Sequence, residues 1–320
     1  MENRRFALYA WGVVAWNLAV ILWGAYVRAS GSGAGCGSHW PLCNGEVMPR
    51  AAEAQTLIEL THRLTSGLAL MLVVGLVVWA FRAYPKRHQV RRCSLLSLLF
   101  ILTEALIGAG LVLLELVGQN ASMARAVYMS VHLINTFVLL AMLALTAYWA
   151  SGGQTMRWRG QGALLWVFAL ALLGTLVLAV SGAVAALGDT LFPSDTLAEG
   201  LSQDFSRTAH LLVRLRLLHP VLAVTTGLFV ILTALMASLR RPGVWTRRLA
   251  LALAALVIVQ LGAGLLNVAL LAPIWLQLVH LLFADLLWLA LVLLTVTALG
   301  QRTQEQESLD QLRLRPAVEL

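Results

Sequence analysis

The chain has 320 residues, of which 60% are hydrophobic and only 12% are charged. A soluble domain carries about 25% charged residues to face water, so this composition excludes a soluble fold and predicts an integral membrane protein. The net charge of +8 does not indicate nucleic acid binding, because the 23 lysine and arginine residues are dispersed and no nucleic-acid-binding motif accompanies them.

Eight apolar stretches are long enough to cross a bilayer, which takes about 20 residues of helix. We expect these spans at 6–29, 57–81, 94–116, 124–149, 162–186, 211–239, 247–271 and 273–299. No stretch alternates with a period of two, which disfavours a β-barrel. The first stretch follows Arg4 and Arg5, as a signal peptide would. Because it is too long and ends at Arg28 rather than at a small-residue cleavage site, we expect a retained span. The fold class is therefore all-α.

The basic residues predict an orientation. If the N-terminus is cytoplasmic, most lysines and arginines fall on inner segments, and the outer loops hold only Arg50 and Arg207. The positive-inside rule then places both termini on the cytoplasmic side of a cell (inner) membrane. Five arginines break the rule by lying at outer helix ends: Arg28, Arg63, Arg125, Arg214 and Arg216.

Two of the three cysteines share the first outer loop. Cys36 and Cys43 lie in an oxidising compartment there, so a disulfide is expected. A metal site is weaker, since only His39 lies nearby as a third ligand and a closed site usually needs four. Cys93 is alone at the inner end of the third span and is expected to be a small core residue.

Three landmarks recur in the same order in the two halves of the chain. The run Ile107–Leu111 (IGAGL) reappears as Leu261–Leu265 (LGAGL), His62 reappears as His219, and His132 reappears as His280. Each half has four spans and therefore inserts the same way up. We expect two four-helix bundles, residues 1–155 and 156–320, related by a pseudo-two-fold axis along the membrane normal.

Four of the seven histidines lie inside spans: His62, His132, His219 and His280. At about 1.5 Å per residue they lie on the order of 10 Å below the outer surface, one pair in each half. A single intramembrane histidine can simply bond a neighbouring helix, but four at matched depth favour a cofactor. Two imidazoles facing across a bundle suit a haem iron with two axial ligands. Zinc would want further ligands, which no cluster supplies. The pattern predicts two haems in the outer half of the bilayer, their irons bound by these four histidines.

Haem propionates are anions that need neutralising near the membrane surface. Arg28, Arg63 and Arg216 lie at outer helix ends and suit that task through bidentate pairing. The alternative is that these arginines bind lipid headgroups or acids in the loops.

Two motifs resemble the haem A synthase family of bacteria. They are the first outer loop, Tyr26–Gly45 with Cys36 and Cys43, and the run Glu59–Arg63, with its Glu-x-x-His-Arg spacing. The resemblance covers nearly the whole chain. One departure is that residues 187–207 contain no cysteine, whereas family members often carry a second cysteine pair in the third outer loop.

The resemblance implies an activity and its partners. The family oxidises the C8 methyl group of haem O to a formyl group, through an alcohol and a geminal diol, giving the haem A of terminal oxidases. The resemblance also implies a resident haem B on His219 and His280, and a substrate-haem site on His62 and His132. Expected partners are the lipid bilayer, a haem O synthase and a membrane electron acceptor such as a quinone.

The two halves differ three residues before a histidine. Glu59 precedes His62 and Arg216 precedes His219, so each shares a helix face with its histidine. A fixed positive charge suits holding a propionate, and an acid beside an iron site suits proton transfer. We therefore expect Glu59, with His62 and His132, to be catalytic. The alternative is that Glu59 caps its span or pairs with Arg63.

Two other functions fit parts of the sequence. A two-haem membrane cytochrome b would exchange electrons with quinone, but its haems usually lie at opposite depths, whereas these histidines lie in one leaflet. A transporter built from two repeats would place polar groups near the midplane. Glu104 and Asp285 lie there, and they equally suit a proton path or buried hydrogen-bonded acids. We derive no role for His39.

Overall fold

The computed structural model describes residues 2–49 and 53–300, and its regular elements in that part of the chain are all helices. Eight stretches are long and apolar enough to cross a membrane, which confirms the all-α class and the number of spans. Seven are single helices: α1 (Glu2–Ala29), α2 (Ala54–Ala83), α3 (Gln89–Leu113), α4 (Met123–Ala150), α5 (Ala163–Leu191), α9 (Val244–Ala269) and α10 (Ile274–Gly300).

The sixth span is broken near one end. It consists of α7 (Leu211–Leu215) and α8 (Leu218–Arg240), separated by Arg216 and Leu217. A further helix, α6 (Leu197–Phe205), lies in the loop before it and was not expected from hydropathy. Its sequence signal is a Thr-x-x-Glu capping pattern, in which the Thr196 side chain accepts a hydrogen bond from the Glu199 amide.

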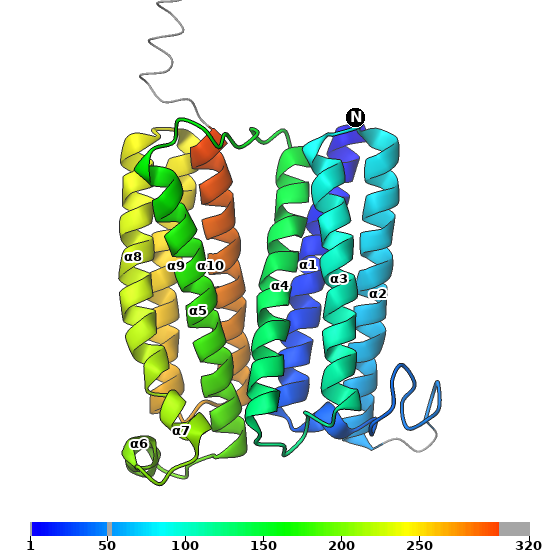
Figure 1. Ribbon diagram of the computed structural model, residues 1–320, viewed down its shortest axis with the longest axis vertical. Coiled ribbons are helices and arrows are strands. Elements are labelled where there is room, and N and C mark those ends of the chain that lie inside the picture. The colour runs from blue at the N-terminus through cyan, green and yellow to red at the C-terminus, as the bar shows by residue number, and fades with distance from the viewer. Residues whose placement is uncertain (1, 50–52, 301–320) are drawn as a thin grey trace, which may run out of the picture.

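The helices form two bundles that lie side by side. Helices α1–α4 make one bundle, and α5, α8, α9 and α10 make the other (Figure 1). Large side chains such as Leu106, Leu228 and Ile258 remain exposed, as expected of a surface that faces lipid. Helices α1 and α4 meet α5 and α10 between the bundles. A two-fold relation would exchange α1 with α5 and α4 with α10; that relation stays a prediction.

The connections at the two ends of the bundles differ in charge. The N-terminus and the α2–α3, α4–α5 and α8–α9 connections share one end, and the loop after α1 lies at the other (Figure 1). The first end therefore carries the lysines and arginines that the sequence analysis assigned to the cytoplasmic side. That this end faces the cytoplasm stays a prediction. Arg50, Arg302, Arg313 and Arg315 lie outside the described residues.

Trp288 joins the bundles. Its indole Nε1 on α10 donates a 2.7 Å hydrogen bond to the Phe137 carbonyl on α4, and the two rings stack with centroids 5.4 Å apart. Trp288 is only 4% exposed, so both the ring and its hydrogen bond contribute where the bundles meet.

Trp288→Ala should destabilise the protein by about 3–5 kcal/mol, because it removes a large buried ring. Trp288→Phe should cost less, about 0.5–1.5 kcal/mol, since mainly the hydrogen bond is lost. Thermal unfolding in detergent measures both. Trp166→Ala is the control, because Trp166 is 70% exposed. Equal melting temperatures for Trp288→Ala and Trp166→Ala would contradict this account of the contact.

Candidate functional site

The four intramembrane histidines lie inside the bundles near the same end. His62 is on α2, His132 on α4, His219 on α8 and His280 on α10, and each is half-buried. All lie at similar depth from the end that carries the loop after α1, counting His219 from the start of α7. Each bundle thus contributes one pair, as predicted, while their place in the outer leaflet stays a prediction.

Each histidine ring packs against a glycine of a neighbouring helix. A Cβ atom on Gly24 of α1 would lie 2.8 Å from His62 Cε1, and one on Gly182 of α5 would lie 2.9 Å from His219 Cε1. The rings of His132 and His280 lie against Gly108 of α3 and Gly264 of α9. A Cβ atom added at these glycines would lie 3.9 Å from His132 Cε1 and 3.4 Å from His280 Cε1. The small residues give the rings room between closely packed helices.

These contacts refine the internal repeat. The sequence paired Gly108 with Gly262, but a Cβ on Gly262 would meet nothing within 4 Å, whereas Gly264 contacts a histidine. The equivalent positions by contact are therefore Gly108 and Gly264. Sequence reasoning also missed Gly24 and Gly182, whose only signal was a glycine in the first span of each half at the depth of the histidines.

His219 and His280 face each other across the second bundle. Their ring centroids are 6.4 Å apart, with the planes at 81°. Imidazole nitrogens bind transition metals at about 2.0–2.1 Å, so a shared metal atom sets the centroids of two such rings roughly 6.3 Å apart. No group of three His, Cys, Asp or Glu side chains within the described residues could hold a metal ion. The pair therefore suits a metal that brings its other ligands with it, as haem does.

The ring nitrogens of the four histidines have different neighbours. Ser181 Oγ lies 3.0 Å from His219 Nδ1, Gln260 Nε2 lies 3.4 Å from His280 Nε2, and Glu104 Oε1 lies 3.3 Å from His132 Nδ1. The Nδ1 atoms of His62, His132 and His280 are buried with no hydrogen-bond partner in the described part of the chain, so the Glu104 contact is an approach within ion-pair distance and not a hydrogen bond. Of the sequence candidates, Glu104 is thus beside a histidine. Asp285 is fully buried, and neither of its oxygens has a hydrogen-bond partner among the residues described.

The loop after α1 is closed by the expected disulfide, Cys36–Cys43. Both cysteines are buried, at 0% and 1% exposure, and pack against Leu60 of α2. The loop approaches α2 so closely that a Cβ on Gly35 would lie 2.5 Å from the Gln55 carbonyl, which explains the glycine. The disulfide therefore lies against the helix that carries His62.

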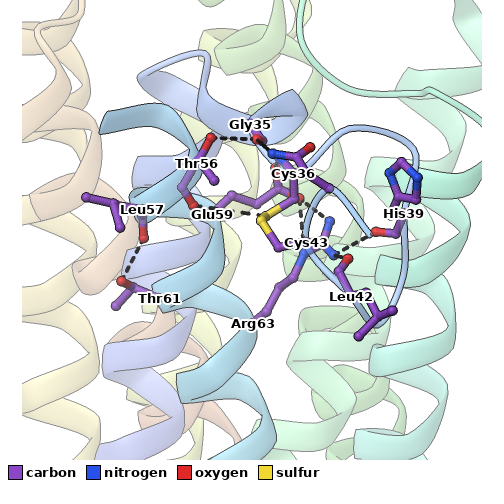
Figure 2. Close-up of a disulfide and its surroundings, with 11 residues drawn as sticks. Gly35, Cys36, His39, Leu42, Cys43, Thr56, Leu57, Glu59, Thr61 and Arg63 are labelled. Atoms are coloured by element: carbon purple, nitrogen blue, oxygen red, sulfur yellow. Dashed lines mark hydrogen bonds and ion pairs between the residues drawn. A yellow bond between two sulfur atoms is a disulfide. The ribbon is translucent and has the colours of Figure 1, made fainter. Parts of the chain in front are cut away.

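Glu59 and Arg63 fasten this loop to α2 (Figure 2). Glu59 Oε2 accepts a 2.8 Å hydrogen bond from the Cys36 amide, and its Oε1 pairs with Arg63 Nη2 at 2.5 Å. Arg63 Nη1 donates to the carbonyls of His39 and Leu42, each at 2.7 Å. The pairing of Glu59 with Arg63, weighed above as the alternative to a catalytic role, is present, and the catalytic role stays a prediction. His39 contributes its carbonyl, a contact that the sequence did not indicate.

Arg216, at the break between α7 and α8, pairs with acids from two other helices. Its Nη1 lies 2.9 Å from Asp189 of α5 and its Nε lies 3.1 Å from Asp204 of α6. Burial raises the pKa of the Asp204 carboxyl, and the Arg216 guanidinium opposes that rise. Nε and Nη2 of Arg216 are buried without a hydrogen-bond partner in the described residues, and Nη2, which also pairs with neither acid, is left to donate to a further anion.

Arg28 links the two bundles. From the end of α1, its Nη1 donates at 2.7 Å to the Ala186 carbonyl and to the Thr190 hydroxyl of α5, and its Nη2 donates at 2.8 Å to Gln277 of α10. The sequence suggested a propionate or a lipid headgroup as its partner. It missed these contacts because they join residues far apart in the chain.

Gly24→Ala and Gly182→Ala should each displace the histidine beside them, since the new methyl group overlaps the ring, and each should therefore lower the amount of haem that the purified chain binds. Gly12→Ala and Gly262→Ala are matched controls, because nothing lies within 4 Å of a Cβ at either position. The measurement is the haem absorbance per purified chain. Normal haem content in Gly24→Ala and Gly182→Ala would show that the glycines do not seat the ligands.

Comparison with known proteins identifies relatives along most of the chain. A family model, COX15-CtaA, described as cytochrome oxidase assembly protein, matches residues 7–292. A Thermus thermophilus protein named protoheme IX farnesyltransferase is 54% identical over 303 residues, which is 95% of this chain and 50% of that protein.

Several further relatives are named heme A synthase, of which two serve as examples. The protein from Exiguobacterium sibiricum is 32% identical over 143 residues, 45% of this chain and 47% of that protein. The protein from Bacillus mycoides is 45% identical over 95 residues, 30% of each chain. The alignments thus cover half or less of these curated relatives. The match of the family model over residues 7–292 confirms the family indicated by the cysteine loop and the Glu-x-x-His-Arg run: the chain belongs to the COX15-CtaA family of cytochrome oxidase assembly proteins.

Proposed function

We propose that this chain is a membrane-bound oxidoreductase of haem A synthesis, which converts haem O into haem A by successive oxidations of its C8 methyl group to a formyl group. The observation that carries the proposal is the pair of half-buried histidines in each bundle, each seated against a glycine at a similar depth. Family membership and the relatives named heme A synthase support the same reaction.

In this proposal the second bundle holds a resident haem B on His219 and His280. The 6.4 Å separation of their ring centroids would allow both imidazoles to hold one iron atom. The free Nη2 donor of Arg216, three residues before His219, suits a propionate. Asp189 and Asp204 hold the guanidinium in place, so it is positioned before the anion binds.

The first bundle is proposed to bind the substrate, haem O, between His62 and His132. When bound, a haem iron supplies redox chemistry that side chains lack. The chain's own part is to orient the substrate and to shield it from water. The disulfide loop lies against α2 at the same end of the bundle as the histidines, where it can cover the substrate. Glu59, almost fully buried three residues before His62, is the candidate for moving a proton. Arg28 and Arg63 remain candidates for contacts with the propionates of bound haem.

The substrate also suggests the partners. The Thermus thermophilus relative is named as a protoheme IX farnesyltransferase, and this chain matches only half of it. We infer that farnesyl transfer and methyl oxidation are consecutive steps on one porphyrin, so a haem O synthase supplies this chain. A membrane quinone is the proposed electron acceptor, and the site lies in the outer half of the cell membrane.

The test is to extract the haems from the purified chain, produced in cells that make haem O, and to identify them by mass. We expect haem B together with haem O, haem A or the alcohol between them. Haem B alone, at two per chain, would instead indicate an electron-transfer cytochrome and overturn the proposal.

Glu59→Gln should leave haem B content unchanged and permit haem O binding but stop or stall methyl oxidation, because the amide cannot exchange the proton. Arg63→Ala is the comparison, since it keeps the acid and releases the loop carbonyls of His39 and Leu42. Turnover is measured by haem mass, and loosening of the loop by the rate at which dithiothreitol reduces Cys36–Cys43. Wild-type turnover in Glu59→Gln would leave this acid only its anchoring role. Equal stalling and equal loosening in both variants would assign the effect to the loop.

A further inference from the structure

The histidines of α4 and α10 face different residues at equivalent positions of the neighbouring helix: Glu104 lies beside Nδ1 of His132, and Gln260 lies beside Nε2 of His280. Among the described residues, His132 is the one of the four with a carboxylate oxygen within 4 Å, Glu104 Oε1 at 3.3 Å from Nδ1. Glu104 stands four residues before Gly108 on α3. Gln260 stands four residues before Gly264 on α9, where its amide lies 3.4 Å from His280 Nε2 and donates to the His280 carbonyl at 3.0 Å. One bundle thus offers its histidine a carboxylate, and the other offers a neutral amide.

The Glu104 carboxylate is held by further polar groups. Asn135 Nδ2 donates to its Oε2 at 2.5 Å, and the Thr136 hydroxyl donates to its Oε1. Asn135 is itself oriented, because its Oδ1 accepts from the Thr103 hydroxyl at 2.7 Å and its Nδ2 also donates to the Phe100 carbonyl at 2.8 Å. Donors reach both oxygens of Glu104, which is the arrangement that an acceptor-only carboxylate requires.

The second bundle lacks this network. Taking Gly264 and His280 as the reference points, the positions of Thr103, Asn135 and Thr136 are occupied by Val259, Phe283 and Ala284. The apolar replacements leave Gln260 without the donors that surround Glu104. The difference therefore extends beyond a single residue: one bundle has built a polar support for an acid beside its histidine, and the other has not.

We propose that Glu104 is a positioning residue that strengthens His132 as an iron ligand and lowers the reduction potential of iron bound there. This inference rests on the proposed function, in which His132 binds the substrate haem. A carboxylate within ion-pair distance of Nδ1 favours a proton on that nitrogen, which leaves the Nε2 lone pair for a metal and makes the imidazole a stronger donor. Added electron density favours the oxidised metal. Gln260 carries no charge and leaves His280 a weaker donor.

The chemical consequence is a difference between the two bundles. Glu104 would make iron bound in the first bundle easier to oxidise, whereas Gln260 would add no charge beside iron bound in the second bundle. The residues would therefore favour the second bundle as the electron acceptor of the two. The acid beside His132 thereby favours oxidation in the bundle proposed to bind haem O.

The test is spectroelectrochemical titration of the purified full chain loaded with haemin. His132→Ala identifies the signal of the first bundle. In Glu104→Gln, the ratio of oxidised to reduced iron in that bundle, at a fixed potential, should fall at least tenfold, which is 59 mV for a one-electron couple. The signal of the second bundle should not move. Gln260→Glu places a carboxylate beside the His280 ring, at Nε2, and its negative charge should raise the same ratio in the second bundle.

The outcomes separate this inference from the proposed function. An unchanged potential in Glu104→Gln, with haemin bound on His132, overturns the inference and leaves the function untouched. If the wild-type chain binds no haemin in its first bundle, the proposed function fails and the inference fails with it. If Glu104→Gln does not fold, Gln260→Glu decides: a lowered potential in the second bundle supports the inference, and an unchanged one overturns it.

Discussion

Placing an imidazole inside an apolar helix bundle requires room between closely packed helices, and the arrangement of the candidate site depends on that room. A histidine ring in a membrane has no water to bond, so it must face the interior of the protein. Room comes above all from Gly24 and Gly182, where a Cβ atom would lie within 3 Å of a ring, while Gly108 and Gly264 face their rings at ordinary contact distance. The contacts that seat the histidines lie where α1 packs on α2 and α3 packs on α4 in one bundle, and where α5 packs on α8 and α9 packs on α10 in the other.

The two bundles share the same arrangement of histidines and glycines, but they differ in the charged residues around the histidines. The first has two acids near its histidines, Glu59 beside the disulfide loop and Glu104 beside His132. The second has Arg216, held by Asp189 and Asp204, and the neutral Gln260. Acids suit a site that handles protons and oxidised metal, and a fixed cation with a spare donor suits retention of an anionic cofactor. The divergence is the physical basis for assigning substrate and resident haem to separate halves.

The sequence predicted those features that depend on local pattern. Hydropathy located eight spans, and two cysteines in one loop indicated their disulfide. Contacts between distant residues could not be predicted in this way: Arg28 reaches α5 and α10, and Arg63 reaches the carbonyls of His39 and Leu42. Helix register was equally out of reach, since a shift of two residues exchanges Gly262 for Gly264 while the glycine pattern looks the same.

The division of labour between the halves is tested most directly by two double variants, His62→Ala with His132→Ala, and His219→Ala with His280→Ala. Each is produced in cells that make haem O, and its haems are counted and identified by mass. The account predicts that the first double variant keeps one haem B and lacks haem O and haem A, while the second loses the haem B. Loss of the same haem from both, or two haems retained by either, would contradict it.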